Sequence, residues 1–384
     1  MGTTTQPETL RAWAEVDLDA LAYNASQLRS ALPGGCGLMA IMKADAYGHG
    51  AEASAKRLRR EGVGAFAVAT AHEGAGLRDA GVEGDILVLG YTHPEEAALL
   101  NGRSLAQLVA DGAHAKALDD AGYKLEVHIA VDTGMHRLGF DYTDVDGMER
   151  VYNYNNLAVR GVATHFAVSD SLLDSDVAFT KLQIERYNSV LESLRLRGRD
   201  VGARHAQASS GILNYPGMEC DYARAGIALY GVKALHAGTV TDLPLRPVLS
   251  LRARIAQVRR IGAGESVSYG RAFYAENPIR LATVNIGYAD GVPRQMSGNG
   301  GVCLVRGERV PIAGRICMDM LMLDVTGVDT AEPGDIVTLI GLDGGEEIRC
   351  EDVARSSGTI TNDILCRLGK RLPRVYIENV ECKT

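Results

Sequence analysis

Residues 40–50 read AIMKADAYGHG, and this stretch is the most informative part of the sequence about both fold and chemistry. The apolar run 38–42 ends at Lys43 and a glycine-containing turn follows, which is typical of a buried strand that delivers an amine to a site. Burial lowers the pKa of a lysine, and only a neutral amine can attack a carbonyl to form a Schiff base. The alternative is a surface lysine just beyond a strand, which is the commoner place for an arbitrary lysine.

A regular pattern continues along the chain from this stretch: short apolar runs alternate with longer amphipathic segments up to about residue 245. Eight runs predict strands, at 38–42, 65–69, 86–89, 105–109, 125–131, 159–164, 205–208 and 222–225. The helix-like segments between them include 51–60, 95–100, 113–121 and 177–194. Eight strands separated by helices favour a (β/α)8 barrel of the TIM type, whose chemistry lies at the carboxyl ends of its strands. A doubly wound open sheet would give a similar pattern and stays open as an alternative.

The pattern changes after about residue 245. Six β-rich runs follow, at 249–258, 279–286, 301–305, 309–312, 320–325 and 335–339, and helical periods return only at 350–355 and 364–368. Strands joined by Gly, Pro, Asp and Asn turns predict a mainly antiparallel β domain. We therefore expect a disordered tail at 1–10, a barrel at 11–245 and a C-terminal β domain at 246–384.

Composition excludes several classes of protein. The chain has 384 residues, 46% of them hydrophobic, with a formal net charge of -8 and no basic patch, which argues against nucleic acid as a partner. The seven cysteines are scattered and lack CxxC spacing, so they predict free thiols in a reducing compartment, and no metal site. No apolar run of about 18 residues predicts a membrane span, and the polar start lacks the apolar segment of a signal peptide. We expect a cytoplasmic protein without membrane contact of its own.

Seven further motifs follow residues 40–50 in order along the chain. They read DTGMHRLG at 132–139, THFA at 164–167, HAQASS at 205–210, ARAGIALYG at 223–231, ESVSYG at 265–270, NIGYADGVPR at 285–294 and GRICMDM at 314–320. Together they make the chain resemble the alanine racemase family of pyridoxal 5'-phosphate (PLP) enzymes, over about residues 13–376. The resemblance implies PLP as the cofactor, with a barrel and a β domain.

The resemblance assigns the cofactor to residues of the barrel half. Lys43 is implied to hold PLP as a Schiff base, and the hydroxyl of Tyr47 to reach the phosphate. Ser209, at an expected helix start, is implied to bind the phosphate too, with an ordinary N-cap serine as the alternative. Gly226 would let the backbone approach the phosphate, where Ile227 can offer its amide.

Three cationic or titratable groups are implied to surround the ring of the cofactor. Arg137 would bond the phenolate oxygen and help to bind the substrate, with a surface salt bridge as the alternative. His165 would lie against the pyridine ring, although a histidine beside apolar residues is more often a satisfied core group. Arg224 would face the pyridine nitrogen, and because a guanidinium keeps its proton, that nitrogen would stay unprotonated. Reprotonation at Cα is then favoured over transamination.

The resemblance also implies a second base, because a racemase needs one on each face of Cα. Lys43 would serve the D-enantiomer and Tyr269 the L-enantiomer, with Tyr269 reaching the site from the partner subunit of a homodimer. A phenol has a pKa near 10, so positive charge from His165 and Arg224 is expected to make it a usable base. The implied substrate-binding residues of the β half are Tyr288 at the entrance, the Met318 amide at the substrate carboxylate, and Asp319 behind them.

Two positions depart from the family pattern. Ala130 stands where many members carry a carbamylated lysine that orients Arg137. Asn362 stands where alanine racemases carry a tyrosine, and the smaller amide leaves room for a hydroxymethyl group that it can hydrogen-bond. The serine racemases of vancomycin-resistance clusters, of the VanT type, resemble this chain at that place. Neutral drift in an alanine racemase is the alternative.

We therefore expect a PLP-dependent racemase of serine and alanine that supplies D-amino acids for peptidoglycan precursors, as in vancomycin resistance. A VanT-type protein would carry a membrane domain before residue 1. The alternatives are an ordinary biosynthetic alanine racemase, an amino-acid decarboxylase of the same barrel group, and a non-catalytic PLP carrier. Arg224 disfavours the decarboxylase, which would place a glutamate there. The β half disfavours the carrier, which would lack it.

Overall fold

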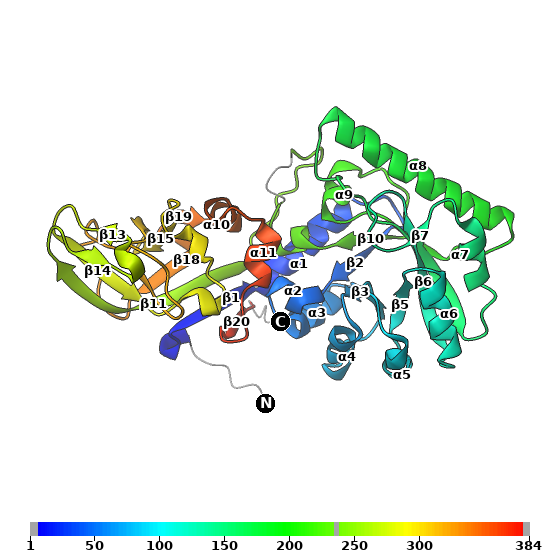
Figure 1. The fold of residues 1–384 in the computed structure, drawn as a ribbon, viewed down its shortest axis with the longest axis horizontal. Helices are drawn as coiled ribbons and strands as arrows, with labels where there is room; N and C mark the ends of the chain where they lie inside the picture. The colour runs from blue at the N-terminus through cyan, green and yellow to red at the C-terminus, as the bar shows by residue number, and fades with distance from the viewer. Residues whose placement is uncertain (1–6, 234–237, 379–384) are drawn as a thin grey trace, which may run out of the picture.

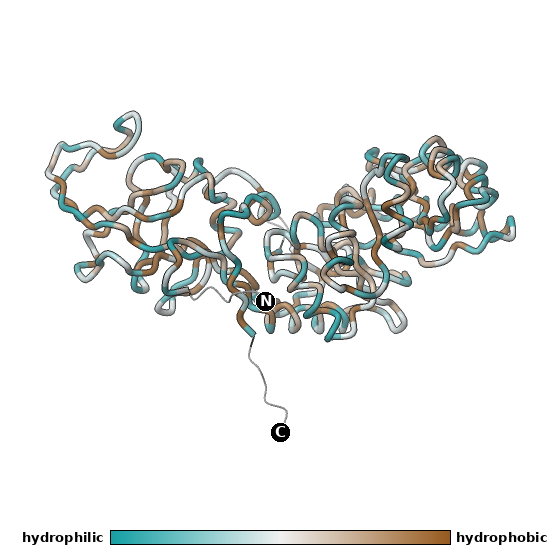
Figure 2. The backbone as a smooth tube through the Cα atoms, turned by 90° about the horizontal axis from the view of Figure 1, so that it is seen from below, coloured by the Kyte–Doolittle hydropathy of each residue, from teal (hydrophilic) through white to brown (hydrophobic). Residues whose placement is uncertain are grey.

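The computed structural model describes residues 7–233 and 238–378, and it shows two parts that lie end to end (Figures 1 and 2). One part is a ring of parallel strands covered by helices, and the other is a mainly antiparallel sheet. A continuous hydrophobic core runs through both, from Leu38 and Phe66 in the ring to Leu304 and Val337 in the second sheet. No helix among the described residues has the length and hydrophobicity needed to cross a bilayer.

Eight parallel strands form the barrel, in the spatial order β10-β2-β3-β4-β5-β6-β8-β9. They are β2 (Gly37–Ile41), β3 (Ala65–Val68), β4 (Asp85–Val88), β5 (Ala106–Val109), β6 (Leu125–Asp132), β8 (Leu157–Ala163), β9 (Ala203–His205) and β10 (Tyr222–Ala225). Two backbone hydrogen bonds join the ends of this order, from Asp221 N to Arg204 O at 2.9 Å and from Arg224 N to Gln207 O at 3.0 Å. The predicted (β/α)8 barrel is therefore confirmed, and the doubly wound sheet is wrong.

Helices cover the outside of the barrel. They are α1 (Leu18–Ser30), α3 (Ala51–Arg60), α4 (Ala71–Asp79), α5 (Ala97–Gly102), α6 (Gly112–Asp120), α7 (Val145–Val151), α8 (Asp174–Leu196) and α9 (Ser209–Asn214). Side-chain caps fix where some of these helices begin: Asp17 accepts from the amides of Asp19 and Ala20 at α1, and Thr70 and Glu73 form a reciprocal capping box at α4.

The second part confirms the predicted antiparallel domain. Its strands include β11 (Leu249–Ile261), β14 (Ile279–Val284), β15 (Val302–Val305), β16 (Glu308–Pro311), β17 (Leu321–Asp324) and β18 (Ile336–Asp343), followed by α10 (Cys350–Ser357) and α11 (Thr361–Cys366). The sequence pattern missed β1 (Ala12–Asp17), which pairs antiparallel with β11 and parallel with β20 (Arg374–Ile377). The second sheet thus takes a strand from the start of the chain. The boundary at residue 245 stays a prediction.

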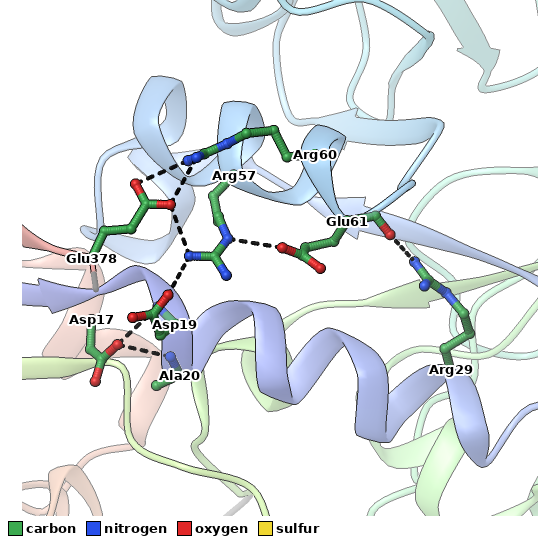
Figure 3. Close-up of polar contacts among 8 residues, drawn as sticks. All are labelled: Asp17, Asp19, Ala20, Arg29, Arg57, Arg60, Glu61 and Glu378. Atoms are coloured by element: carbon green, nitrogen blue, oxygen red, sulfur yellow. Dashed lines mark hydrogen bonds and ion pairs between the residues drawn. The ribbon is translucent and has the colours of Figure 1, made fainter. Parts of the chain in front are cut away.

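The predicted tail at 1–10 lies largely outside the described residues, and Pro7–Thr9 form a short 3-10 turn. The other end of the chain is tied to the barrel by charge (Figure 3). Glu378, which follows β20, contacts Arg57 at 3.0 Å and Arg60 at 2.8 Å, both on α3. Arg57 also contacts Asp19 of α1 at 2.5 Å, so one guanidinium joins β20, α3 and α1.

Candidate active site

A cavity of about 540 Å³ opens at the carboxyl ends of the barrel strands, and it collects the predicted cofactor residues. Its lining includes Lys43, Tyr47, Arg137, His165, Ser209, Arg224, Gly226, Ile227 and Asn362. Eight of these come from the barrel, and Asn362 comes from α11, which packs beside α2 (Lys43–Tyr47) where the two parts meet (Figure 1). The size and mixed lining suit a small cofactor and its substrate.

Lys43 follows β2 after one intervening residue, Met42, and lines this cavity. Its amine makes no hydrogen bond or ion pair with the described residues. Burial, and next the positive charge of Arg137, lower the pKa of Lys43 below its ordinary value, against smaller opposing effects of Cys366 and Glu73. A lysine pKa lowered by burial is what the sequence predicted for this position.

The four residues after Lys43 form a left-handed helical turn that the sequence pattern did not predict. Ala44, Asp45, Ala46 and Tyr47 have φ of 52, 54, 55 and 51°. Hydrogen bonds of 2.9 Å close the turn, from Ala46 N to Met42 O and from Gly48 N to Ala44 O. The left-handed conformation costs a non-glycine residue roughly 1–2 kcal/mol, so four in a row need strong support.

Two neighbours provide part of that support. The carboxylate of Glu73, already in the capping box of α4, accepts from Ala44 N at 2.7 Å. Gly48 ends the turn with φ of 79°, and a Cβ there would lie 2.4 Å from Leu365 O of α11. Glycine at this position therefore allows α11 to approach, and this approach brings Asn362 to the cavity. The capping-box spacing of Thr70 and Glu73 was the only signal for Glu73 in the sequence.

Next to the Tyr47 hydroxyl at the end of the turn, the cavity wall holds a cradle of further hydroxyl and amide groups. Ser209 Oγ accepts from Gly226 N at 2.9 Å and from Ala228 N at 3.1 Å, which leaves its own hydrogen free to donate. A Cβ on Gly226 would lie 2.9 Å from the Tyr47 hydroxyl and 3.6 Å from Ser209 Oγ, so glycine keeps this space open. The N-cap of α9 is Ala208, and Ser209 does not cap the helix as the alternative supposed. Hydroxyl donors and an uncrowded backbone fit a phosphate group.

Arg224 is buried in the wall of the cavity, and both terminal nitrogens of its guanidinium are hydrogen-bonded. Its guanidinium donates to the carbonyls of Thr164, His205 and Ala206 at 2.7–2.9 Å. It also donates to Nδ1 of His205 at 2.8 Å and Nδ1 of His165 at 3.1 Å. Burial lowers the pKa of Arg224 to about 10, which still leaves it charged at neutral pH. A fixed cation at this place would disfavour protonation of the pyridine nitrogen of PLP.

The contacts of Arg224 decide the proton positions on three histidines. Because the guanidinium can only donate, Nδ1 of both His165 and His205 accepts, and each neutral ring carries its proton on Nε2. His205 Nε2 then donates to His128 Nδ1 at 2.9 Å. Burial and the charges of Arg224 and Arg137 lower the pKa of His165 to about 3. The expectation that His165 supplies positive charge to the second base is therefore wrong, since it is neutral; Arg224 is the cation there.

Arg137 and Ala130 line the same cavity. Arg137 is exposed and makes no hydrogen bond or ion pair with the described residues, so the alternative of a surface salt bridge is wrong for this structure. No side chain at Ala130 reaches toward it, because the alanine ends at its methyl group. Arg137 is thus free to bond a ligand.

The β half holds a second cavity, of about 600 Å³, lined by Tyr269, Tyr288, Arg294 and Arg367 among others. Tyr269 is 67% exposed, and the fold of one chain does not bring it or Tyr288 into the cavity of Lys43. Met318 is 52% exposed, and it lies outside both cavity linings.

The segment of Met318 is held by charges that the sequence analysis missed. Arg371 contacts Asp319 at 2.7 Å and the buried Asp290 at 3.4 Å, and Arg11 binds Asp290 at 2.6 Å. These pairs join residues far apart in the chain, so no local pattern could have revealed them.

The barrel presents a desolvated lysine, a phosphate cradle and a buried arginine at one end, with a β domain beside it. This combination is typical of PLP enzymes with a barrel fold. Comparison with known proteins identifies the family. The sequence matches the family models for the alanine racemase N-terminal domain over residues 16–234 and the alanine racemase C-terminal domain over residues 248–376. The chain belongs to the alanine racemase family, its cofactor is PLP, and it is a racemase.

Individual relatives support this membership. The alanine racemase of a Geobacter species is 40% identical over 373 residues, which cover 94% of this chain and 98% of that one. An amino-acid racemase of Enterococcus faecalis is 39% identical over 366 residues, 95% of this chain and 51% of that protein. The crystal structure of alanine racemase from Bacillus anthracis with bound L-Ala-P superimposes with a TM-score of 0.89 at 32% identity, over 96% of this chain and 95% of that one.

Proposed function

We propose that this chain interconverts L- and D-alanine with PLP, as an ordinary alanine racemase does, and that it also accepts serine. The observation that supports it most is the amine of Lys43, which makes no hydrogen bond or ion pair with the described residues and shares one cavity with the buried cation Arg224. The names of the relatives favour the ordinary alanine racemase over a dedicated serine racemase. Such an enzyme supplies D-alanine for peptidoglycan precursors.

Each residue of the cavity would contact a different part of PLP or of the substrate, according to its position. Tyr47, Ser209 and the backbone at Gly226 and Ile227 would hold the phosphate, and Lys43 would hold the aldehyde end. PLP, when bound, supplies an electron sink that acidifies the Cα hydrogen of the amino acid. Arg224 limits that sink because it keeps its own proton. Arg137, which has no other partner, would bond the phenolate oxygen and the substrate.

Lys43 would move the proton on one face of Cα, because a lowered pKa favours the neutral amine, which is the form that can accept a proton. The other face needs a second base, and we propose Tyr269 of the partner subunit of a homodimer. The exposed position of Tyr269 supports this, as do the exposed apolar side chains of Tyr274, Tyr288, Met318 and Met320 in the same part of the chain. Arg224 and the neutral His165 would then face that tyrosine from the barrel.

Serine as an additional substrate rests on Asn362. Its side chain lines the cavity of Lys43 and makes no hydrogen bond with the described residues, so its amide is free to meet a hydroxymethyl group. A preference for serine over alanine would place the chain with the VanT-type racemases of vancomycin resistance, and with their membrane-anchored architecture. The six described cysteines are all free thiols, which supports a reducing, cytoplasmic place of action.

The test is kcat/KM for L-alanine and L-serine with the purified chain and added PLP. Turnover of alanine supports the racemase proposal, and PLP binding without turnover of either amino acid would refute it in favour of a PLP carrier. A serine value equal to that of alanine or above it would support the resistance-type function. A strong alanine preference would leave the ordinary alanine racemase.

A further inference from the structure

His49 belongs to the motif at residues 40–50, but it does not line the cavity of Lys43 and has no part in the proposed chemistry. The ring is fully buried. Its Nδ1 lies 2.9 Å from Ala46 O and 2.9 Å from Tyr47 O. Both partners are carbonyl oxygens, so Nδ1 must carry the proton and donate it to them.

These two carbonyls belong to the left-handed turn that connects Lys43 to Tyr47. Ala46 O also accepts from His49 N at 3.1 Å, so the histidine holds this oxygen with both its backbone and its ring. A left-handed run of non-glycine residues persists only where its surroundings fix it. His49 contacts the C-terminal side of the turn through these two carbonyls, and Glu73 contacts its N-terminal side through Ala44 N.

The ring of His49 is itself fixed from the other side. It stacks on Tyr230 at 4.4 Å between ring centroids, with 28° between the planes. Tyr230 packs against the ring of Tyr47 at 5.3 Å, and its hydroxyl donates to Ile41 O at the end of β2. Nε2 has no hydrogen-bond partner within residues 7–233 and 238–378, and His49 borders a small cavity of about 20 Å³ that has room for one water. The histidine therefore bridges the end of β2 and the strained turn.

We propose that His49 is a positioning residue, which holds the left-handed turn so that the amine of Lys43 and the hydroxyl of Tyr47 face one PLP molecule. This inference rests on the proposed function, because it gives Lys43 and Tyr47 their roles. It assigns to the second half of the 40–50 motif a task distinct from contact with the cofactor.

The experiment tests the Nδ1–H donor of His49 and its aromatic ring separately. His49→Phe keeps an aromatic ring against Tyr230 but removes the N–H, whereas His49→Asn keeps a donor near the place of Nδ1 and removes the ring. Adding Ala44→Gly to His49→Phe relieves the turn itself, because glycine accepts positive φ and residue 44 is exposed. His114→Phe is the matched control, a buried histidine of α6 that bonds Thr92 O at 3.0 Å away from the cavity.

Each apo protein is titrated with PLP, and kcat and KM for alanine are then measured. We expect His49→Phe to bind PLP about tenfold more weakly, as the loss of a donor to two buried carbonyls implies. Its kcat should fall with little change in KM. His49→Asn should stay within about threefold of the wild type, and Ala44→Gly should restore most of the binding. His114→Phe should bind PLP like the wild type.

Equal PLP affinity of His49→Phe and the wild type overturns the inference and leaves the proposed function standing. A wild-type chain that binds PLP but racemises nothing overturns the proposed function instead. If His49→Phe does not fold, the comparison uses His49→Asn and the double variant. PLP binding by either then supports the positioning role, and loss of binding in both overturns it.

Discussion

Gly226→Ala tests the phosphate cradle. The new Cβ would lie 2.9 Å from the Tyr47 hydroxyl and 3.6 Å from Ser209 Oγ, in the space between the two donors. A methyl group there displaces the phosphate from about two charge-assisted hydrogen bonds, each worth roughly 1.5 kcal/mol. The loss of about 3 kcal/mol corresponds to PLP binding that is roughly a hundredfold weaker. The assay is titration of the apo protein with PLP, followed by fluorescence.

The control is Gly76→Ala on α4, where an added Cβ meets nothing within 4 Å. This variant should bind PLP normally and gain up to about 1 kcal/mol in unfolding free energy, because alanine is the better helix former. Thermal unfolding of both apo variants separates a local block from misfolding. PLP affinity of Gly226→Ala within twofold of the wild type, in a protein that unfolds normally, would refute the cradle.

Three further predictions concern the second base, the substrate and pH. Mixed dimers of Lys43→Ala and Tyr269→Ala chains should regain about a quarter of wild-type activity, since half of the dimers are mixed and each holds one intact site; no recovery would show that Tyr269 does not act across an interface. Asn362→Tyr should lower the serine-to-alanine ratio of kcat/KM by about tenfold or less, and an unchanged ratio would remove Asn362 as the selector. Burial and the charge of Arg224 lower the pKa of His128 to about 4, so its contribution to stability is present above pH 6.5 and is lost as the pH falls toward 4. From pH 7 to 5 this amounts to about 2 kcal/mol, and urea unfolding of His128→Phe should lose less stability over that range than the wild type.

The sequence predicted most of the barrel because many of its strands contain a short apolar run, such as Ala65–Val68, which the periodicity detects directly. The exception is β9 (Ala203–His205), which has no such run, and the strand expected at 205–208 overlaps it only at His205. It missed β1 because Ala12–Asp17 is a single strand whose partners, β11 and β20, lie far away in the chain. The left-handed turn was also missed. Ala44, Asp45 and Ala46 have no local preference for positive φ, and distant groups such as Glu73 impose it.

Within the candidate site, the motifs predicted which residues gather around the cavity but not their protonation. His165 was expected to be a cation, because the sequence does not show how deeply it is buried or that a guanidinium contacts its Nδ1. Tyr269 could be assigned only through the resemblance. The cavity that it lines lies in the β half, apart from the cavity of Lys43.

The pairing of β1 with β20 has a consequence for how the protein is made. Ala14 pairs with Arg374, so β1 is synthesised long before its partner β20. The barrel can assemble while synthesis continues, because its strands lie between them. One edge of β1 stays unpaired throughout that time and is a place where nascent chains could pair wrongly. Once β20 has been synthesised, the second sheet can close and Glu378 can reach α3.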